Sequence, residues 1–297
     1  GRERSSDHVA RSTGHGVPRD GGQAPLRARP VRELDATNDK HLWQDQGDAG
    51  PWPVYKGASF NIWEPDTGVR YGTADPTVVR AELQRKRLRQ NKLARSAFSD
   101  FSREWAEDAS TLPCLRPRIA FRDVTNRTNT RTVIAALVPG NLVITNQAPY
   151  VLWAEGDERD EAYLLGVLCS MPLDWYARRY VELHVNFHIF NGLPVPRPDR
   201  DDPLRRRVEG IAGRLAAVDE RDAEWAEVVG VDVASVRDEA ERDDLISELD
   251  AAVALLYGLD ESDLRVIYTT FHEGADYSAR LAAVTEHHRR LAAEHLS

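Results

Sequence analysis

The chain has 297 residues, 41% of them hydrophobic and 29% charged, with a formal net charge of -9 at pH 7. This composition is typical of a globular protein rather than a fibrous or disordered one, and the length suffices for two domains. The two cysteines, Cys114 and Cys169, indicate no disulfide framework or zinc site, and no apolar run is long enough to span a membrane. We therefore expect a cytoplasmic protein with no membrane partner.

The charge is distributed unevenly along the chain. Residues 80–132 contain 13 Lys and Arg against 6 Asp and Glu, whereas residues 199–263 contain 20 acidic residues against 8 Arg. A basic middle and an acidic tail permit a local phosphate-binding surface that the net charge conceals.

Residues 1–50 are rich in Gly, Arg, Asp and Pro and have no hydrophobic periodicity. This pattern predicts a disordered tail or linker, and order is expected to begin at residue 51. The sequence does not start with Met. We expect it to be a piece of a longer protein, or to start inside a longer reading frame.

The next segment mixes helical and strand-like patterns. Apolar residues recur at a helical spacing over residues 76–108, and Asp75 followed by Pro76 predicts the start of that helix. Strands are expected over residues 117–124, 132–138 and 141–145. A helix is expected over residues 160–168, continuing in helical style after Pro172, and residues 186–198 read as extended.

From Pro203 onward the pattern is helical, and Gly258 is expected to end one of the helices. The fold class predicted from these elements is α+β: a small mixed sheet with flanking helices, followed by an all-α C-terminal helical region, after a disordered N-terminal tail. The expected divisions are residues 1–50, 51–198 and 199–297.

No catalytic or metal site is predicted. The Gly-x-Gly at residues 14–16 lacks a preceding strand, and no phosphate-binding loop or nucleophile elbow is present. His184 and His188 could share one face of a helix, as metal ligands do, but the residues around them are equally compatible with a strand. The acidic cluster at residues 199–202 reads as a solvated helix start.

The polar segment between the expected strands, residues 118–132, is the candidate functional region. Arginine can fork onto a guanine edge or a phosphate, asparagine can pair with adenine, and threonine can contact a phosphate or a thymine methyl group. A loop of this composition suits a surface that reads nucleic acid. An ordinary exposed hairpin explains the same composition, and the sequence leaves both interpretations open.

Three stretches together resemble a known family: residues 118–139 with 146–153, residues 160–198, and residues 246–271, which include LDAAVALLYGL. They resemble, in the same order, the C-terminal target-recognition region of large adenine-specific DNA methyltransferases, namely type IIG-like restriction–modification enzymes and phage-defence methylases. Residues 52–63, WPVYKGASFNIW, resemble the entry to that region.

The resemblance implies a module that recognises a sequence in double-stranded DNA. The catalytic half of such enzymes carries S-adenosylmethionine (SAM) and an Asn-Pro-Pro-Tyr loop, and this sequence contains neither. Residues 146–150, NQAPY, share the Asn and Tyr of that loop but have an extra residue and only one proline. We therefore expect no cofactor in this chain, SAM in a catalytic methyltransferase domain or subunit that is its partner, and little activity from the chain alone.

The expected DNA contacts divide into a basic face and a base-reading loop. The residues are Arg85, Lys86, Arg87, Arg89, Lys92, Arg118, Arg122, Thr125, Asn126, Arg127, Thr128, Asn129 and Arg131. Two other interpretations remain: a helical scaffold or protein-interaction protein with no role on DNA, and an intact enzyme whose chemistry the sequence does not reveal.

Overall fold

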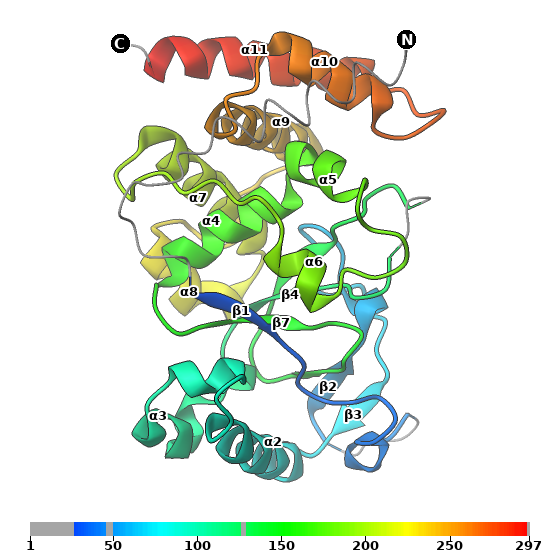
Figure 1. Ribbon diagram of the computed structural model, residues 1–297, viewed down its shortest axis with the longest axis vertical. Helices are drawn as coiled ribbons and strands as arrows, with labels where there is room; N and C mark the ends of the chain where they lie inside the picture. The colour runs from blue at the N-terminus through cyan, green and yellow to red at the C-terminus, as the bar shows by residue number, and fades with distance from the viewer. Residues whose placement is uncertain (1–26, 46–49, 126–128, 296–297) are drawn as a thin grey trace.

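The computed structural model of the chain describes residues 27–45, 50–125 and 129–295. Two small β-sheets form in the first half of the chain, and helices gather in the second half (Figure 1). The predicted class, an α+β part with flanking helices followed by an all-α region, is confirmed. Residues 1–26 of the predicted tail lie outside the described residues.

The elements follow one another in an order that mixes strands and helices up to residue 191 and is helical afterwards. The strands are β1 (Ala28–Val31), β2 (Trp52–Tyr55), β3 (Gly72–Ala74), β4 (Arg118–Phe121), β5 (Ala135–Val138), β6 (Val143–Ile144) and β7 (Tyr150–Trp153). The helices are α2 (Pro76–Asn91), α3 (Arg103–Glu107), α4 (Glu158–Cys169), α5 (Met171–Ala177), α6 (Phe187–Asn191), α7 (Pro203–Ala216), α8 (Ala223–Val229), α9 (Glu239–Leu256), α10 (Glu261–Thr270) and α11 (Ser278–His295).

The larger sheet has the strand order β1-β7-β4-β5, and all its neighbours are antiparallel. Its edge strand β1 lies in the segment that was predicted as a tail, so that prediction is wrong for residues 27–45. The composition of this segment carries no periodic signal. Backbone pairing to β7, far along the chain, holds β1 in place, with Ala28 opposite Trp153 and Val31 opposite Tyr150.

Strand β4 is buried on both faces because the sheet lies between two cores. Ile119 and Phe121 belong to the core beneath the C-terminal helices, whereas Ala120 belongs to a second core on the opposite face. The smaller sheet, in the order β3-β2-β6, forms a third core with Val79 and Leu83 of α2. Helix α2 begins as predicted, since the Asp75 side chain accepts a hydrogen bond from the Thr77 N–H.

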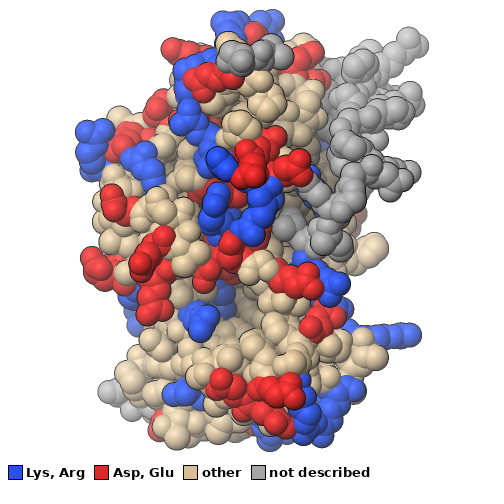
Figure 2. Space-filling view, turned by 90° about the vertical axis from the view of Figure 1, so that its left-hand side faces the viewer, with Lys and Arg blue, Asp and Glu red and all other residues tan. Residues whose placement is uncertain are grey.

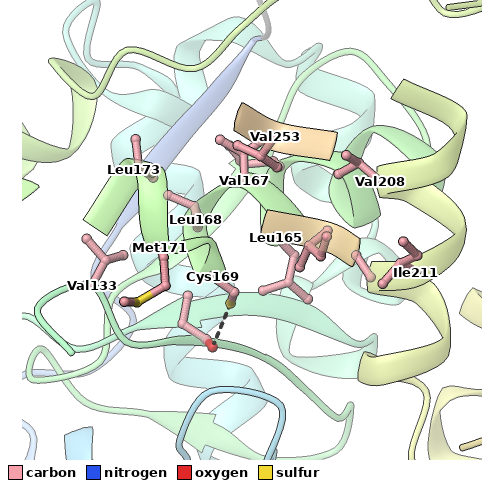
Figure 3. Close-up of a cluster of buried hydrophobic side chains, with 14 of the residues drawn as sticks. Val133, Leu165, Val167, Leu168, Cys169, Met171, Leu173, Val208, Ile211 and Val253 are labelled. Atoms are coloured by element: carbon pink, nitrogen blue, oxygen red, sulfur yellow. Dashed lines mark hydrogen bonds between the residues drawn. The ribbon is translucent and has the colours of Figure 1, made fainter. Parts of the chain in front are cut away.

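Helix α4 is the centre of the helical core, and Figure 3 shows Leu165 and Leu168 among side chains from α7 and α9. The Cys169 thiol at its end donates to the Ala135 carbonyl at 3.5 Å, which ties the helix to β5 (Figure 3). The core contains residues from both sides of position 198. The boundary expected there therefore runs through one continuous core.

Three local predictions are wrong. The helix expected over residues 76–108 ends at Asn91. Two separate short helices follow it, because the Ser96 side chain caps a 3-10 helix at Ala97–Asp100 and the Ser102 side chain caps α3. Helix α5 ends at Ala177 rather than continuing to residue 185. The segment expected to be extended contains the short helix α6, which the Asn186 side chain caps.

Candidate nucleic-acid interface

The exposed face of α2 carries two of the predicted residues, Arg85 and Arg89, and a third, Lys92, directly follows the helix. Arg85 pairs with Glu82 at 2.5 Å. For Arg89 and Lys92 the described part of the chain offers no ion-pair partner, and both side chains are exposed. These two residues are therefore free to contact an anion.

Lys86 and Arg87, on the same helix, are engaged within the protein. Lys86 forms an ion pair with Asp39, which is buried. Arg87 is 2% exposed and donates to the Thr111 hydroxyl and the Asp108 carbonyl, both at 2.8 Å. Its partners join α2 to the segment after α3, so Arg87 stabilises the fold.

Arg118 is likewise enclosed. It is 3% exposed, and its Nη2 lies 3.0 Å from the Glu33 Oε2 and 3.2 Å from the Leu142 carbonyl. The Glu33 carboxylate also accepts from the Ile144 N–H at 2.8 Å. This buried pair connects β4, β6 and the residues after β1, and it leaves the guanidinium no access to DNA.

Two further predicted arginines also point into the protein. Arg122 is half-buried and donates to the Phe60 carbonyl at 2.5 Å. The Arg131 side chain lies 2.5 Å from Asp174 and donates to the Cys169 carbonyl at 2.7 Å. Arg87, Arg118 and Arg131 are engaged by partners within the fold and are not available to DNA.

The predicted base-reading loop is fixed at both ends. Where it begins, the Thr125 N–H donates to the Leu183 carbonyl at 3.0 Å, and the Val185 N–H donates to the Asp123 carbonyl at 2.8 Å. Where it ends, the Arg178 guanidinium donates to the carbonyl of Asn129 at 3.1 Å. Both anchors come from α5 and the segment that follows it.

The side chains of this loop differ in exposure. Thr125 is buried, and its hydroxyl accepts a hydrogen bond from the half-buried Asn129 amide at 3.3 Å. Asn126, Arg127 and Thr128 lie outside the described residues. Their role in reading bases stays a prediction from the sequence.

A groove lies beside the free edge of β1, between the end of α2 and α6, and we call it the β1–α6 groove. Its volume is about 480 Å³. Its polar and aromatic lining residues are Arg29, Arg32, Gln90, Arg95, Ser96, Phe187 and Asn191. No aspartate or glutamate is among the described residues that line it, whereas three other hollows of the described structure each include a carboxylate, such as Glu33, Glu248 or Asp238. The β1–α6 groove therefore presents positive charge that no lining carboxylate offsets.

The three arginines of this groove differ in their engagement. Arg29 donates to Asp100 at 3.0 Å and to the Ser96 carbonyl at 3.3 Å, which fixes its position. Arg32 and Arg95 are exposed, and the Arg32 guanidinium lies 5.2 Å from the centre of the Phe187 ring. The two exposed arginines are the ones that can bind a ligand anion.

Sequence reasoning missed this groove. Arg95 lies within the basic stretch and could have been included, but Arg32 fell in the predicted tail and had no local signal. The groove exists because β1, α2 and α6, which are distant in sequence, meet in the fold, and Figure 1 shows α6 in front of the sheet next to β1.

The groove and the loop are linked by one short segment. Residues 183–185 hold the beginning of the loop, and Asn186 caps α6, whose Phe187 and Asn191 line the groove. The side of the molecule that carries α3 and α8 is different: Figure 2 shows basic and acidic side chains intermingled there.

In the part of the chain that it describes, the structure shows neither a cluster of metal ligands nor an activated thiol. Among the described residues, no three His, Cys, Asp or Glu side chains come together as metal ligands would. His184 lies 3.4 Å from the carboxylate of Asp123 instead. Burial raises the pKa of both thiols, Cys114 and Cys169, to about 12, so neither is a ready nucleophile at neutral pH. Of the described helices, none has the length and apolar character that crossing a bilayer requires.

Comparison with known proteins does not identify a relative. No protein-family model matches the sequence, and no curated protein matches it significantly.

Proposed function

We propose that this chain is the target-recognition part of an adenine-specific (N6) DNA methyltransferase of the restriction–modification type, acting in the cytoplasm. It binds double-stranded DNA and leaves methyl transfer to a catalytic domain or subunit that holds SAM. The observation that carries the proposal is the β1–α6 groove, which has exposed arginines and no lining carboxylate and whose helix α6 directly follows the segment that holds the start of the loop.

The basic residues contribute affinity in this proposal. Arg89, Lys92 and Arg95 are exposed near the end of α2, and the exposed Arg32 lines the same groove as Arg95. Contacts of Lys and Arg with phosphates release counterions from DNA, so they strengthen binding to any sequence and make it sensitive to salt.

The loop contributes sequence specificity. Because both ends of the loop are anchored, a few of its side chains can meet the edges of DNA bases in a defined geometry. Each good bidentate contact is worth about 1–3 kcal/mol of discrimination between bases. The sequence predicts these contacts for Asn126, Arg127 and Thr128. Arg178 and residues 183–185 act through the loop backbone as positioning groups.

The alternative, a helical scaffold, has less support. A scaffold needs exposed apolar surface for its partner. Among the large apolar side chains that are exposed in the described structure, Val228 alone belongs to the C-terminal helices. The apolar faces of these helices are used within the protein's own core.

The proposal is tested by gel shift on duplex DNA at about 50 and 200 mM salt, where six to ten phosphate contacts lose about 10³–10⁵ in affinity. We expect steep weakening with salt, and a smaller salt dependence for a variant that combines Arg89→Ala with Lys92→Ala. Each phosphate contact removed lowers the log–log slope by about 0.9.

The matched control is Arg237→Ala, which removes an exposed arginine from a hollow that contains Asp238. It should bind DNA as the unaltered chain does. Absence of duplex binding by the unaltered chain, or equal losses in the control, would overturn the proposal.

A further inference from the structure

We propose that the β1–α6 groove binds a nucleotide of an unpaired DNA strand, with the phosphate at Arg95 and the base against Arg32. This site is distinct from the loop that is proposed to read the duplex. It uses the groove arginines that are also proposed to contact duplex phosphates, and separate measurements on single-stranded and duplex DNA keep the two proposals distinguishable.

The stacking surface is the pair of Arg32 and Phe187. The guanidinium of Arg32 lies 5.2 Å from the ring centre of Phe187, so the ring supports one side of it, and the residue remains exposed. Unpaired bases stack on arginine planes as well as on aromatic rings. A base can therefore rest on the side of the Arg32 guanidinium that faces away from Phe187.

The phosphate position is provided by Arg95. It is exposed, lines the same groove, and has no carboxylate partner in the described structure. The neighbouring Arg29 adds positive charge but is held by Asp100 at 3.0 Å. Since no carboxylate lines the groove, an anion there meets no like charge among the lining residues.

Two amides complete the site. Gln90, on α2, and Asn191, on α6, line the groove from opposite sides, and no hydrogen bond occupies either side-chain amide in the described structure. An amide offers a donor and an acceptor together, which matches the edge of a base.

The walls between these polar groups are apolar, and Leu93 on one wall is 55% exposed. An exposed leucine next to a stacking arginine gives a flat base an apolar contact. The groove volume of about 480 Å³ falls within the range of about 300–1,000 Å³ of small-molecule sites. The combination of stacking group, cation, amides and apolar wall is the composition that proteins use for single-stranded nucleic acid.

The experiment measures fluorescence anisotropy of a short labelled oligo(dA) strand and, separately, of a duplex, with the full chain. We expect the single strand to bind, and Arg32→Ala to weaken this binding about 5- to 140-fold, since stacking of one base is worth about 1–3 kcal/mol. Arg32→Lys keeps the charge but removes the plane. It should lose several-fold in affinity while the salt dependence stays unchanged.

Controls separate the possible outcomes. Arg237→Ala should bind the single strand normally, and thermal melting shows whether each variant is folded. Competition by dAMP at concentrations where inorganic phosphate has no effect supports a nucleotide site. Equal competition by both would mean an adventitious anion site and overturn the inference.

The two proposals fail differently. Duplex binding without single-strand binding overturns the nucleotide site and leaves target recognition standing. Single-strand binding without duplex binding overturns target recognition and leaves the nucleotide site standing. If Arg32→Lys binds oligo(dA) as tightly as the unaltered chain, stacking on Arg32 is excluded.

Discussion

The Nε of Arg131 lies 2.5 Å from the Oδ2 of Asp174, a residue of α5 that is completely enclosed. The same carboxylate accepts hydrogen bonds from the backbone N–H groups of Thr132 and Val133, each at 3.0 Å. One buried side chain of α5 therefore fixes the end of the candidate recognition loop, and the C-terminal helices that pack on α5 support the loop indirectly.

Asp174→Asn is expected to destabilise the protein strongly. The change removes the carboxylate that the Arg131 guanidinium contacts directly, and breaking one side of such a buried pair typically costs about 3–5 kcal/mol. Urea denaturation followed by circular dichroism measures the loss. Asp201→Asn removes an exposed carboxylate that pairs with Arg206, and it should change the unfolding free energy by about 1 kcal/mol or less. Comparable losses in the two variants would contradict the buried pair.

The ion pair of Glu33 and Arg118 makes a second prediction. Glu33→Gln alone should lower the unfolding free energy by about 3–5 kcal/mol, because Arg118 stays buried without its partner. The double variant Glu33→Leu with Arg118→Met should be more stable than Glu33→Gln, since no unpaired charge remains. A double variant that is less stable than the single one would show that the pair itself, rather than the unpaired charge, dominates.

Gly166 is expected to resist enlargement even though alanine favours helices. A Cβ atom there would lie 2.7 Å from the Val208 Cγ1 and 3.1 Å from the Ala212 Cβ, where α4 meets α7. Gly166→Ala should therefore cost about 1–3 kcal/mol by overpacking. Gly210, also helical, has no heavy atom within 4 Å of an added Cβ. Gly210→Ala should be neutral or stabilise by up to about 1 kcal/mol, and a stabilising Gly166→Ala would refute the close approach of the two helices.

Glu161 predicts a pH dependence of stability. Burial raises the pKa of this carboxyl to about 8, although the Trp225 indole N–H donates to it at 3.0 Å. The folded protein therefore holds a proton that the unfolded chain, with an ordinary glutamate pKa of about 4.3, releases above that pH. Between these two pKa values the unfolded state binds fewer protons, so this group makes stability fall as pH rises, by up to about 1.4 kcal/mol per pH unit. Above about pH 8 its contribution stays constant.

Glu161→Gln removes this titration while its amide oxygen can still accept from Trp225. We expect the stability of the variant relative to the unaltered chain to rise from pH 5 to pH 8, in urea denaturation at fixed ionic strength. The comparison isolates Glu161 from other buried acids such as Asp222, whose pKa burial raises to about 6. A constant difference across this range would mean that Glu161 titrates normally.

The local signals in the sequence determined where several elements begin and end. Asp75 and Pro76 start α2, and Gly258, with a φ of +69°, follows the end of α9, because capping and left-handed turns depend on residues only a few positions apart. The apolar residues Ile119, Ala120 and Phe121 likewise indicated the buried strand β4. These features predicted an α+β part followed by helices, and the structure has that class.

The tertiary structure alone decided which arginines reach the solvent. Arg118 and Arg131 were indistinguishable from surface arginines in the sequence, but their carboxylate partners lie 85 and 43 residues away along the chain. Burial of a guanidinium depends on such distant partners, which no local pattern encodes.

The same reason explains β1 and the groove beside it. A strand with no periodic signal becomes ordered when a distant strand completes its backbone hydrogen bonds, as β7 does for β1. Arg32 follows that strand and meets Phe187 and Arg95 at one groove only after the chain has folded. Residue types therefore decided the kind of fold, whereas long-range pairing decided where the accessible positive charge lies.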